Sequence, residues 1–509
     1  MSTIKEDLIL EIEKRVEDSI LETSNANLLK KLIRNASSDD EAIAIATLGT
    51  TYKRTGLHFD KRLEKITNTI TYFSKNEELS FHNDDKKPTH KLIIGDNYKA
   101  LLNLLIGYKG KVDVIYIDPP YGKDSMGEFA QTNYDNSITR DNLLSMLYPR
   151  LWLAKQLLSP QGVIFCSIDD RNQSYLKCLF DEVFGERNFV ANFIWQKRKT
   201  QANLTKHVAS RHEYILMYSK NRDVLETKKL PLRDSYVQSL YKNPDNDPRG
   251  LWMTKPIASP DNAPNKEFEL DLRNGRKVTA KWRVSQESYD KWLKDNLIVI
   301  PNDGKGMPRA KVFLKDIEGQ IPNTLLMDIA TTEEGSKEIE KCLGSNGVFA
   351  YPKPTKLLNF LFSIIPTENS IILDFFAGSG TTGHSVLDLN AQDGGERTFI
   401  LCQLNEKTDT TPNGIAHDVT AKRLKRIMTG ECYDGNTNFD WIKKHEAYGG
   451  NLDVYDINEV ANFENSEGKT PLNVIDETLY GVEKFKTLEE KTNWVCNNFA
   501  ITQKEEETK

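Results

Sequence analysis

The sequence predicts an α/β protein in which a mostly parallel sheet carries helices on both faces. Two stretches, 91–195 and 365–407, alternate short apolar strands with amphipathic helices. Helical crossovers join parallel strands, and strands buried on both faces show continuous apolar runs. Neither stretch makes a complete domain, so we expect one sheet built from both, with residues 196–345 inserted between them.

The individual elements follow from apolar runs and helical spacing. The predicted strands cover 91–94, 112–117, 163–168, 370–374 and 398–404, and the predicted helices cover 98–105, 141–158, 175–184 and 382–389. Gly162 marks the turn that opens the third of these strands.

Outside these stretches the chain changes character. Residues 1–85 are predicted to be a helical region, because apolar residues recur at three- and four-residue steps in 7–16 and 27–33. The insert 196–345 is rich in Pro, Asn, Asp and Gly and shows no strand–helix alternation, which indicates a separate, loop-rich domain. Residues 431–509 turn polar and end in a charged tail that we expect to be disordered.

Composition indicates a globular protein of the cytoplasm. The chain has 509 residues, of which 38 % are hydrophobic and 28 % charged, and no run approaches the roughly 18 apolar residues that span a bilayer. The first residues are polar and lack the apolar segment of a signal peptide. Six cysteines without a CxxC pair argue against a zinc site and against a disulfide framework.

Positive charge is concentrated in the middle of the chain. The net charge is −6, but residues 196–330 contain 25 Lys and Arg against 17 Asp and Glu, a local net of +8. A polyanion would therefore meet the middle of this chain rather than its ends. The alternative interpretation is an ordinary fluctuation of local charge.

A tetrapeptide of chemical interest, Asp118-Pro119-Pro120-Tyr121, follows the strand at 112–117. It begins where a buried strand ends, and ligands bind at that edge of open parallel sheets. The alternative is a diproline turn that Asp118 caps and that binds nothing.

These residue types suit the capture of an exocyclic amino group. The lone pair of adenine N6 is delocalised into the ring, so this nitrogen is a poor nucleophile. The Asp118 carboxylate and the Pro119 carbonyl could accept its two N–H groups and pull it towards tetrahedral geometry, while Tyr121 stacks on the base. A base inside a duplex is out of reach, so the nucleotide must first be flipped out.

A glycine turn, Phe376-Ala377-Gly378-Ser379-Gly380, follows the strand at 370–374 and opens a helix. Glycines at such a turn let the backbone approach a ligand closely. The third glycine of a dinucleotide fingerprint is missing, so a pyrophosphate is not implied. The alternative is a tight strand–helix turn without a ligand.

Together the two motifs resemble the S-adenosylmethionine-dependent, amino-directed DNA methyltransferases of the beta class, in which the catalytic half precedes the cofactor half. Further segments are similar to the modification (Mod) subunits of type III restriction systems: 92–101, 147–151, 163–170, 189–195, 212–216 and 351–355. The resemblance covers 88–220 and 345–500.

The resemblance implies a Rossmann-like methyltransferase fold. Its expected parts are a helical N-terminal region at 1–85, a catalytic half at 86–195, a target-recognition insert at 196–345, a cofactor half at 346–430 and a C-terminal region at 431–509 with a role in dimerisation.

The resemblance also assigns residues to the site. It assigns catalysis to Asp118, Pro119, Pro120 and Tyr121, and S-adenosylmethionine binding to Asp96, Lys353, Asp374, Phe376, Gly378, Gly380, Thr381, Gln403 and Asn405. Many relatives carry an acidic residue at position 403, where it holds the cofactor ribose, and an amide binds a hydroxyl less strongly than a carboxylate does. Asn405 or Glu406 could share this task. No metal is expected.

A basic stretch at 196–211 contains no acidic residue. Its basic residues are Lys197, Arg198, Lys199, Lys206 and Arg211. Beside a base-flipping pocket such a stretch would serve as a phosphate clamp. The alternative is a solvated loop.

The predicted function is therefore methylation of adenine N6 in a short sequence of double-stranded DNA, with the target adenine flipped out. The resemblance implies two partners, a second copy of the chain and a separate helicase–nuclease (Res) subunit. Nothing in the sequence resembles a nuclease or an ATPase, and it has no GxxxxGK(S/T) phosphate loop, so a Res activity would come from a separate subunit. Three alternatives stay open: a solitary adenine methyltransferase, a cytosine-N4 methyltransferase, whose motif more often begins with Ser, and a catalytically silent DNA-binding subunit.

Overall fold

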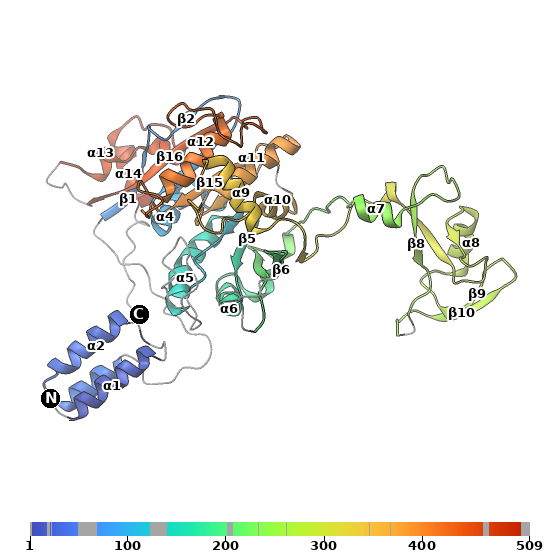
Figure 1. Cartoon of the computed structure of the whole chain (residues 1–509), viewed down its shortest axis with the longest axis horizontal. Helices are drawn as coiled ribbons and strands as arrows, with labels where there is room; N and C mark the ends of the chain where they lie inside the picture. The colour runs from blue at the N-terminus through green and yellow to red at the C-terminus, as the bar shows by residue number, and fades with distance from the viewer. Residues whose placement is uncertain are drawn as a thin grey trace. The chain divides into compact units, whose positions relative to one another are not determined.

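The computed structural model of the chain contains two compact units (Figure 1). The first unit combines residues 1–226 with 323–509, and the second is residues 227–322. The structure describes residues 3–17, 21, 23–48, 69–122, 140–200, 207–232, 234–260, 262–345, 347–366, 368–461 and 468–499.

A large mixed sheet forms the centre of the first unit. Its strands follow the order β1-β16-β3-β15-β14-β4-β5-β7-β6-β13, and β2 pairs with β16. The strands are β1 (Thr69–Lys75), β2 (Phe81–His82), β3 (Thr89–Ile94), β4 (Val112–Ile117), β5 (Leu158–Ile168), β6 (Phe189–Gln196), β7 (His212–Ser219), β13 (Leu325–Leu326), β14 (Ile371–Asp374), β15 (Thr398–Gln403) and β16 (Asn451–Ala461).

The central strands of this sheet are parallel, as the sequence predicts. Neighbouring strands from β16 to β5 pair in parallel, and β7 is antiparallel to both β5 and β6. Because β7 and β13 lie in this sheet, the second unit covers fewer residues, 227–322, than the insert predicted at 196–345.

The two halves of the sequence meet where β14 lies beside β4. Ile372 and Leu373 pair with Val114 and Ile115 in a parallel register. The order of the strands reverses here, since β14 is followed by β15 on one side and β4 by β5 on the other. Ligands of open α/β sheets bind at the carboxyl ends of the strands at such a reversal.

Helices cover the sheet in two layers. One layer contains α4 (Asn97–Tyr108), α5 (Arg140–Leu157), α6 (Gln173–Phe184) and α14 (Leu488–Phe499), and the other contains α9 (Thr332–Leu343), α10 (Thr355–Ser363), α11 (Thr381–Asp393) and α12 (Lys422–Thr429). Helix α5 connects β4 to β5, and α11 connects β14 to β15, so the two connections lead towards opposite ends of the sheet. Because such crossovers are right-handed, α5 and α11 lie on opposite faces. The Rossmann-like arrangement predicted from the sequence is therefore confirmed.

The N-terminal region is only partly helical, contrary to the prediction for 1–85. Helices α1 (Thr3–Glu17), α2 (Thr23–Asn35) and α3 (Asp39–Leu48) share a small core of their own. Residues 69–75 instead form β1, which pairs with β16. Their β-branched and aromatic side chains suit a strand, and the partner strand lies almost 400 residues away in the sequence, where local patterns do not reveal it.

The C-terminal region completes the sheet. β16 is inserted between β1 and β3, and the short helix α13 (Pro471–Val474) and α14 follow it. Buried Tyr480 stacks on Phe73 of β1, accepts a hydrogen bond from the Phe73 N–H (2.8 Å) and donates one to Asn103 Oδ1 (2.8 Å). The tail after 499, which the sequence predicts to be disordered, lies outside the described residues.

The second unit has a small mixed fold. It contains α7 (Asp234–Leu240), β8 (Trp252–Pro256), β9 (Glu267–Asp271), β10 (Lys277–Lys281), α8 (Gln286–Lys294), β11 (Ile298–Val299) and β12 (Arg309–Phe313). β9 and β10 form a hairpin, while β11, β12 and β8 form a three-stranded sheet. Trp282 and Tyr289 lie in its core.

The described part of the chain contains no helix that is long and apolar enough to cross a membrane.

We expect Tyr480→Phe to lower the free energy of unfolding by about 1–3 kcal/mol, because the buried Phe73 N–H and Asn103 side chain would lose their partner. Thermal unfolding followed by circular dichroism measures the loss. Tyr236→Phe, which removes an exposed hydroxyl, is the matched control and should leave the melting temperature unchanged. Equal melting temperatures for both variants would contradict the structural role of Tyr480.

Candidate active site

The Asp118–Tyr121 segment leaves β4 at its carboxyl end. β4 is held between β14 and β5, and the buried Tyr116 hydroxyl lies 2.8 Å from Ser167 Oγ of β5. Asn172 Nδ2 then donates a hydrogen bond to the Tyr121 carbonyl (2.6 Å), and Arg171 Nη1 donates one to the Gly122 carbonyl (2.9 Å). The segment is therefore fixed by β4 before it and by hydrogen bonds to the Tyr121 and Gly122 carbonyls at its end.

The glycine turn leaves β14 beside it. Buried Asp374 closes the turn by accepting hydrogen bonds from the Phe376 N–H (2.9 Å) and the Thr382 hydroxyl (2.6 Å). Gly378 and Gly380 adopt φ angles of 51° and 75°, in the left-handed region that favours glycine. The α11 helix begins immediately after Gly380.

A cavity of about 300 Å³ joins the two motifs. All four residues of the Asp118–Tyr121 segment line it, and so do Asp374, Phe376, Gly378, Ser379, Thr381 and Thr382 of the turn and helix. The segment 349–353 closes a further side, and Tyr351 stands there with 54 % of its surface exposed and a φ of 53°. A non-glycine residue in that conformation is strained, which is a frequent feature of ligand sites.

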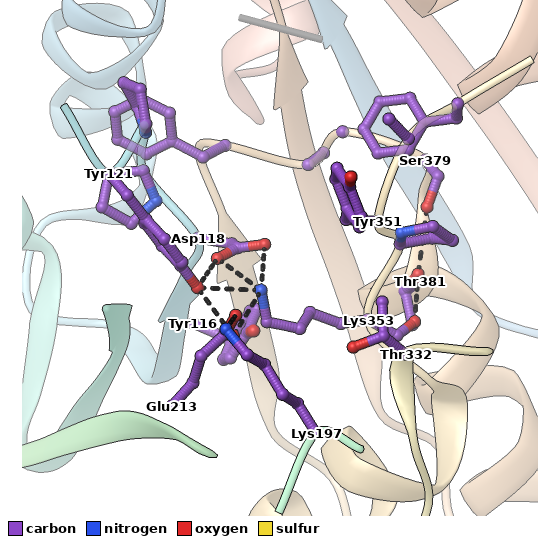
Figure 2. Close-up of a pocket in the computed structure, with 18 of the residues that line it drawn as sticks. Tyr116, Asp118, Tyr121, Lys197, Glu213, Thr332, Tyr351, Lys353, Ser379 and Thr381 are labelled. Carbon is purple, nitrogen blue, oxygen red and sulfur yellow. Dashed lines mark hydrogen bonds and ion pairs between the residues drawn. The ribbon is translucent and has the colours of Figure 1, made fainter. Parts of the chain in front are cut away.

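A buried ammonium group lies at the centre of the polar side of this cavity (Figure 2). Lys353 Nζ is 2.9 and 2.8 Å from the two Asp118 carboxylate oxygens, 2.9 Å from the Tyr121 hydroxyl and 3.4 Å from Glu213 Oε2. Lys197 Nζ contacts the other Glu213 oxygen at 3.1 Å. The Tyr121 hydroxyl can donate to Asp118 Oδ1 (2.9 Å) or to Glu213 Oε2 (3.1 Å).

The charges in this cluster fix one another's protonation. Burial alone would lower the pKa of Lys353, but the Asp118 and Glu213 carboxylates outweigh it and raise that pKa. Burial would raise the pKa of Glu213, but Lys353 and Lys197 bring it below its usual value. Burial and then the two carboxylates raise the pKa of Tyr121 well above its usual value. At neutral pH the site therefore contains an ammonium, a Glu213 carboxylate and a neutral tyrosine.

The cavity brings together five of the nine residues predicted to bind the cofactor, namely Lys353, Asp374, Phe376, Gly378 and Thr381. The other four, Asp96, Gly380, Gln403 and Asn405, lie outside the cavity lining. Asp96 caps α4 by accepting from the Tyr98 and Lys99 N–H groups and pairs with Arg150. Gly380 starts α11, and Asn405 Nδ2 donates to the Asn413 carbonyl (2.8 Å).

Gln403 braces the glycine turn. Its Oε1 accepts a hydrogen bond from the Gly378 N–H (2.7 Å), and its Nε2 donates one to the Leu404 carbonyl (2.9 Å). The side chain is buried. Many relatives have an acidic residue at this position. In this chain the Gln403 amide instead connects the glycine turn to the Leu404 backbone.

The basic stretch does not act as one group. Lys197 turns into the cavity and pairs with Glu213, and Arg198 lines the same cavity. Lys199 is exposed and lies 4.0 Å from Asp328. The Arg211 carbonyl accepts a hydrogen bond from the Lys197 N–H, which ties the two ends of the stretch together. Lys206 lies outside the described residues.

Sequence reasoning missed Glu213 as a site residue. It belongs to β7 and lies inside the segment 212–216 that resembles the Mod subunits. The available signal was an acidic residue directly before the largely apolar run 214–218, since carboxylates are rarely buried without a partner. The partners come from 197 and 353, so the pattern of one segment does not reveal them.

We expect Asp374 to give the protein a pH-dependent stability. Burial, the largest cause, raises the pKa of Asp374 from 3.8 to about 7. The folded state therefore binds this proton more tightly than the unfolded chain, and the stabilisation, complete below about pH 4, is lost as the pH rises through about 7. Compared with Asp374→Asn, the melting temperature of the native protein should fall as the pH rises from about 4 to about 7. The same change of melting temperature with pH in the native protein and in Asp374→Asn would contradict the raised pKa of Asp374.

Comparison with known proteins identifies the family. A family model described as DNA methylase matches residues 112–410, which contain both motifs, the cavity and the second unit. A second model, for uncharacterised conserved proteins, matches residues 5–114.

Three curated relatives show how far the similarity extends. The chain is 33 % identical to the type III restriction-modification enzyme StyLTI Mod subunit of Salmonella typhimurium, over 76 % of this chain and 65 % of the relative. It is 30 % identical to the EcoPI Mod subunit of Escherichia phage P1, over 70 % and 65 %. It is 31 % identical to the type II methyltransferase M.KpnI of Klebsiella pneumoniae, over 69 % and 89 %.

The matched region therefore spans 65 % of the length of each of the two Mod subunits and most of the length of M.KpnI. Since the family model covers more than half of the sequence and includes the Asp118–Tyr121 segment and the glycine turn, this chain belongs to the DNA methylase family.

Proposed function

We propose that this protein transfers the methyl group of S-adenosylmethionine to the N6 amino group of adenine in a short DNA sequence. The observation that carries the proposal is the single cavity in which Asp118, Pro119, Pro120 and Tyr121 face the glycine turn. One wall offers acceptors for an amino group and the other offers a backbone turn for a small cofactor, so a base and a methyl donor would meet between them.

The residues of the cavity fit this cofactor. The turn combines backbone that approaches the cavity closely with apolar Phe376 and buried Asp374, while Tyr351 and Phe349 supply further aromatic surface. Such a mixture of apolar walls and a few polar groups suits a nucleoside that carries an amino-acid side arm. When bound, S-adenosylmethionine supplies an electrophilic methyl group. Phe376, Gly378 and Thr381 would hold it, with Gln403 and Asp374 fixing the turn from behind.

Asp118 would activate the base. Its carboxylate is 27 % exposed and opens into the cavity, so it can accept one N–H of a flipped adenine, while the Pro119 carbonyl accepts the other. The ring of Tyr121 would stack on the base. Lys353 keeps its proton at neutral pH, so the proton released from N6 during transfer has to leave through a carboxylate or through solvent.

The second unit would recognise the DNA. It contains 18 Lys and Arg against 13 Asp and Glu, a net positive charge that suits a polyanion. We assign the target-recognition role to the predicted insert 196–345, whose compact part is 227–322. Arg198 and Lys199 lie at its start and would contact phosphates near the flipped nucleotide.

Similarity to subunits of type III restriction-modification enzymes also suggests protein partners for this chain. Two of the relatives are named as Mod subunits of type III restriction-modification enzymes, so a Res helicase–nuclease subunit and a second copy of this chain are the proposed partners. The similarity to M.KpnI, over 89 % of its length, supports a second candidate, a methyltransferase that works without such a subunit. Purification from cells that also carry the neighbouring genes would separate the two.

We expect Asp118→Ala to abolish methylation, because the carboxylate that captures the amino group is lost. Single-molecule sequencing of DNA from cells that express the native chain should show N6-methyladenine at one short motif, and the variant should show none. Retained DNA affinity of the variant in a gel-shift assay is the control for folding. Loss of methylation in a variant that still binds DNA excludes a catalytically silent binding protein. Methylcytosine in place of methyladenine would establish the cytosine-N4 alternative, and equal marks in both strains would refute the role of Asp118.

We expect Gln403→Leu to weaken S-adenosylmethionine binding about tenfold, since the buried Gly378 N–H loses its acceptor and the turn loosens. Isothermal titration calorimetry measures the affinity. Gln403→Glu, the matched control, keeps an acceptor for Gly378 and should bind the cofactor more tightly than the leucine variant does. Equal affinities of the native chain and the leucine variant would show that the turn does not depend on this side chain.

A further inference from the structure

The Lys353 ammonium faces more acceptors than it can serve. Four oxygen atoms lie within 3.4 Å of Nζ: both carboxylate oxygens of Asp118, the Tyr121 hydroxyl and Glu213 Oε2. An ammonium group has three N–H donors. One of the four oxygens is therefore always without a full hydrogen bond from Lys353, whose Nζ lies among the side chains of Asp118, Tyr121 and Glu213 (Figure 2).

This excess matters because the proposed reaction needs one of these oxygens. A flipped base has to donate an N–H to Asp118, but Lys353 holds both Asp118 oxygens at hydrogen-bond distance. If Lys353 gives up one of them, three acceptors remain for its three N–H donors. When the amino group of a base donates to one Asp118 oxygen, all four oxygen atoms around Lys353 therefore have a hydrogen-bond donor.

Glu213 is the group that can draw Lys353 aside. It is buried on β7 and its Oε2 is already at ion-pair distance from Nζ, opposite Asp118. Lys197 and the Tyr121 hydroxyl hold the carboxylate in place. A second carboxylate in this position lets the ammonium move off an Asp118 oxygen without leaving a buried charge unpaired, which would be costly.

We propose that Glu213 is a positioning residue for methyl transfer: when the target base enters, it draws Lys353 off one carboxylate oxygen of Asp118, and this oxygen then receives an N–H of the base. The inference rests on the proposed function and adds to it a residue outside both sequence motifs. Without Glu213, Asp118 is the one carboxylate left within reach of Lys353 among the described residues, and the ammonium competes with the base for it.

A double-mutant cycle on the full-length protein tests this mechanism. Single-turnover methyl transfer is measured at saturating S-adenosylmethionine and DNA, on an oligonucleotide that contains the motif found by sequencing. Glu213→Gln should lower the rate constant at least about tenfold in the native background. In a Lys353→Met background the same change should lower it less than about threefold, because the competing ammonium is gone.

The cycle separates positioning from a general structural role. Glu213 also contacts Lys197 and Tyr121, which are present in both backgrounds, so a structural role would give equal losses with and without Lys353. Equal losses would overturn the inference. The exposed pair Asp440–Lys443 provides the matched control, and Asp440→Asn with Lys443→Met should be without effect singly and together.

Two further outcomes have defined meanings. If Glu213→Gln does not fold, as judged by its melting curve, Glu213→Asp keeps the charge but shortens its reach and should show the same dependence on Lys353. If the native chain methylates its site and the cycle shows no coupling, the inference fails while the proposed function stands. A native chain that transfers no methyl group would overturn both.

Discussion

The parallel pairing of β4 with β14 is the constraint on which the site depends. It joins Val114 and Ile115 to Ile372 and Leu373, residues more than 250 positions apart, and fixes which turns leave the sheet side by side. Because both strands end at the same edge, the Asp118–Tyr121 segment and the glycine turn must face one cavity. Each motif alone has an ordinary structural explanation as a turn. At their common edge of the sheet, the two motifs line one cavity.

Burial then makes the charged groups of this edge interdependent. Lys353 approaches from the segment before α10, Glu213 from β7 and Asp118 from the end of β4, so three distant parts of the chain supply one cluster. In such surroundings an unpaired charge is costly, and the positions of the groups are set jointly rather than singly. The tyrosine hydroxyl between the two carboxylates remains protonated for the same reason. A base that enters this cavity meets an ordered set of acceptors.

The proposed catalytic site and the proposed DNA-recognition unit belong to different compact units of the chain. The second unit, 227–322, has its own small core around Trp282 and Tyr289, and the chain returns from it to the sheet at β13. A unit with its own core can change its surface without disturbing the sheet. The site, in contrast, is tied to the sheet through backbone contacts such as those of Asn172 and Gln403. The surface of the second unit and the geometry of the site therefore depend on different sets of contacts.

The central strands, their helices and the two motifs could be predicted from the sequence, because apolar runs, helical spacing and turn residues are local signals. It also placed Lys353, Gly378 and Gln403 near the site through resemblance. Three features became visible in the folded chain alone. β1 and β16 extend the sheet, Gln403 accepts a hydrogen bond from the glycine turn, and Glu213 forms ion pairs with both Lys197 and Lys353. Each of these features is a contact between segments that lie far apart in the sequence. Such a contact depends on the side chains of both segments, so the pattern of either segment alone does not reveal it.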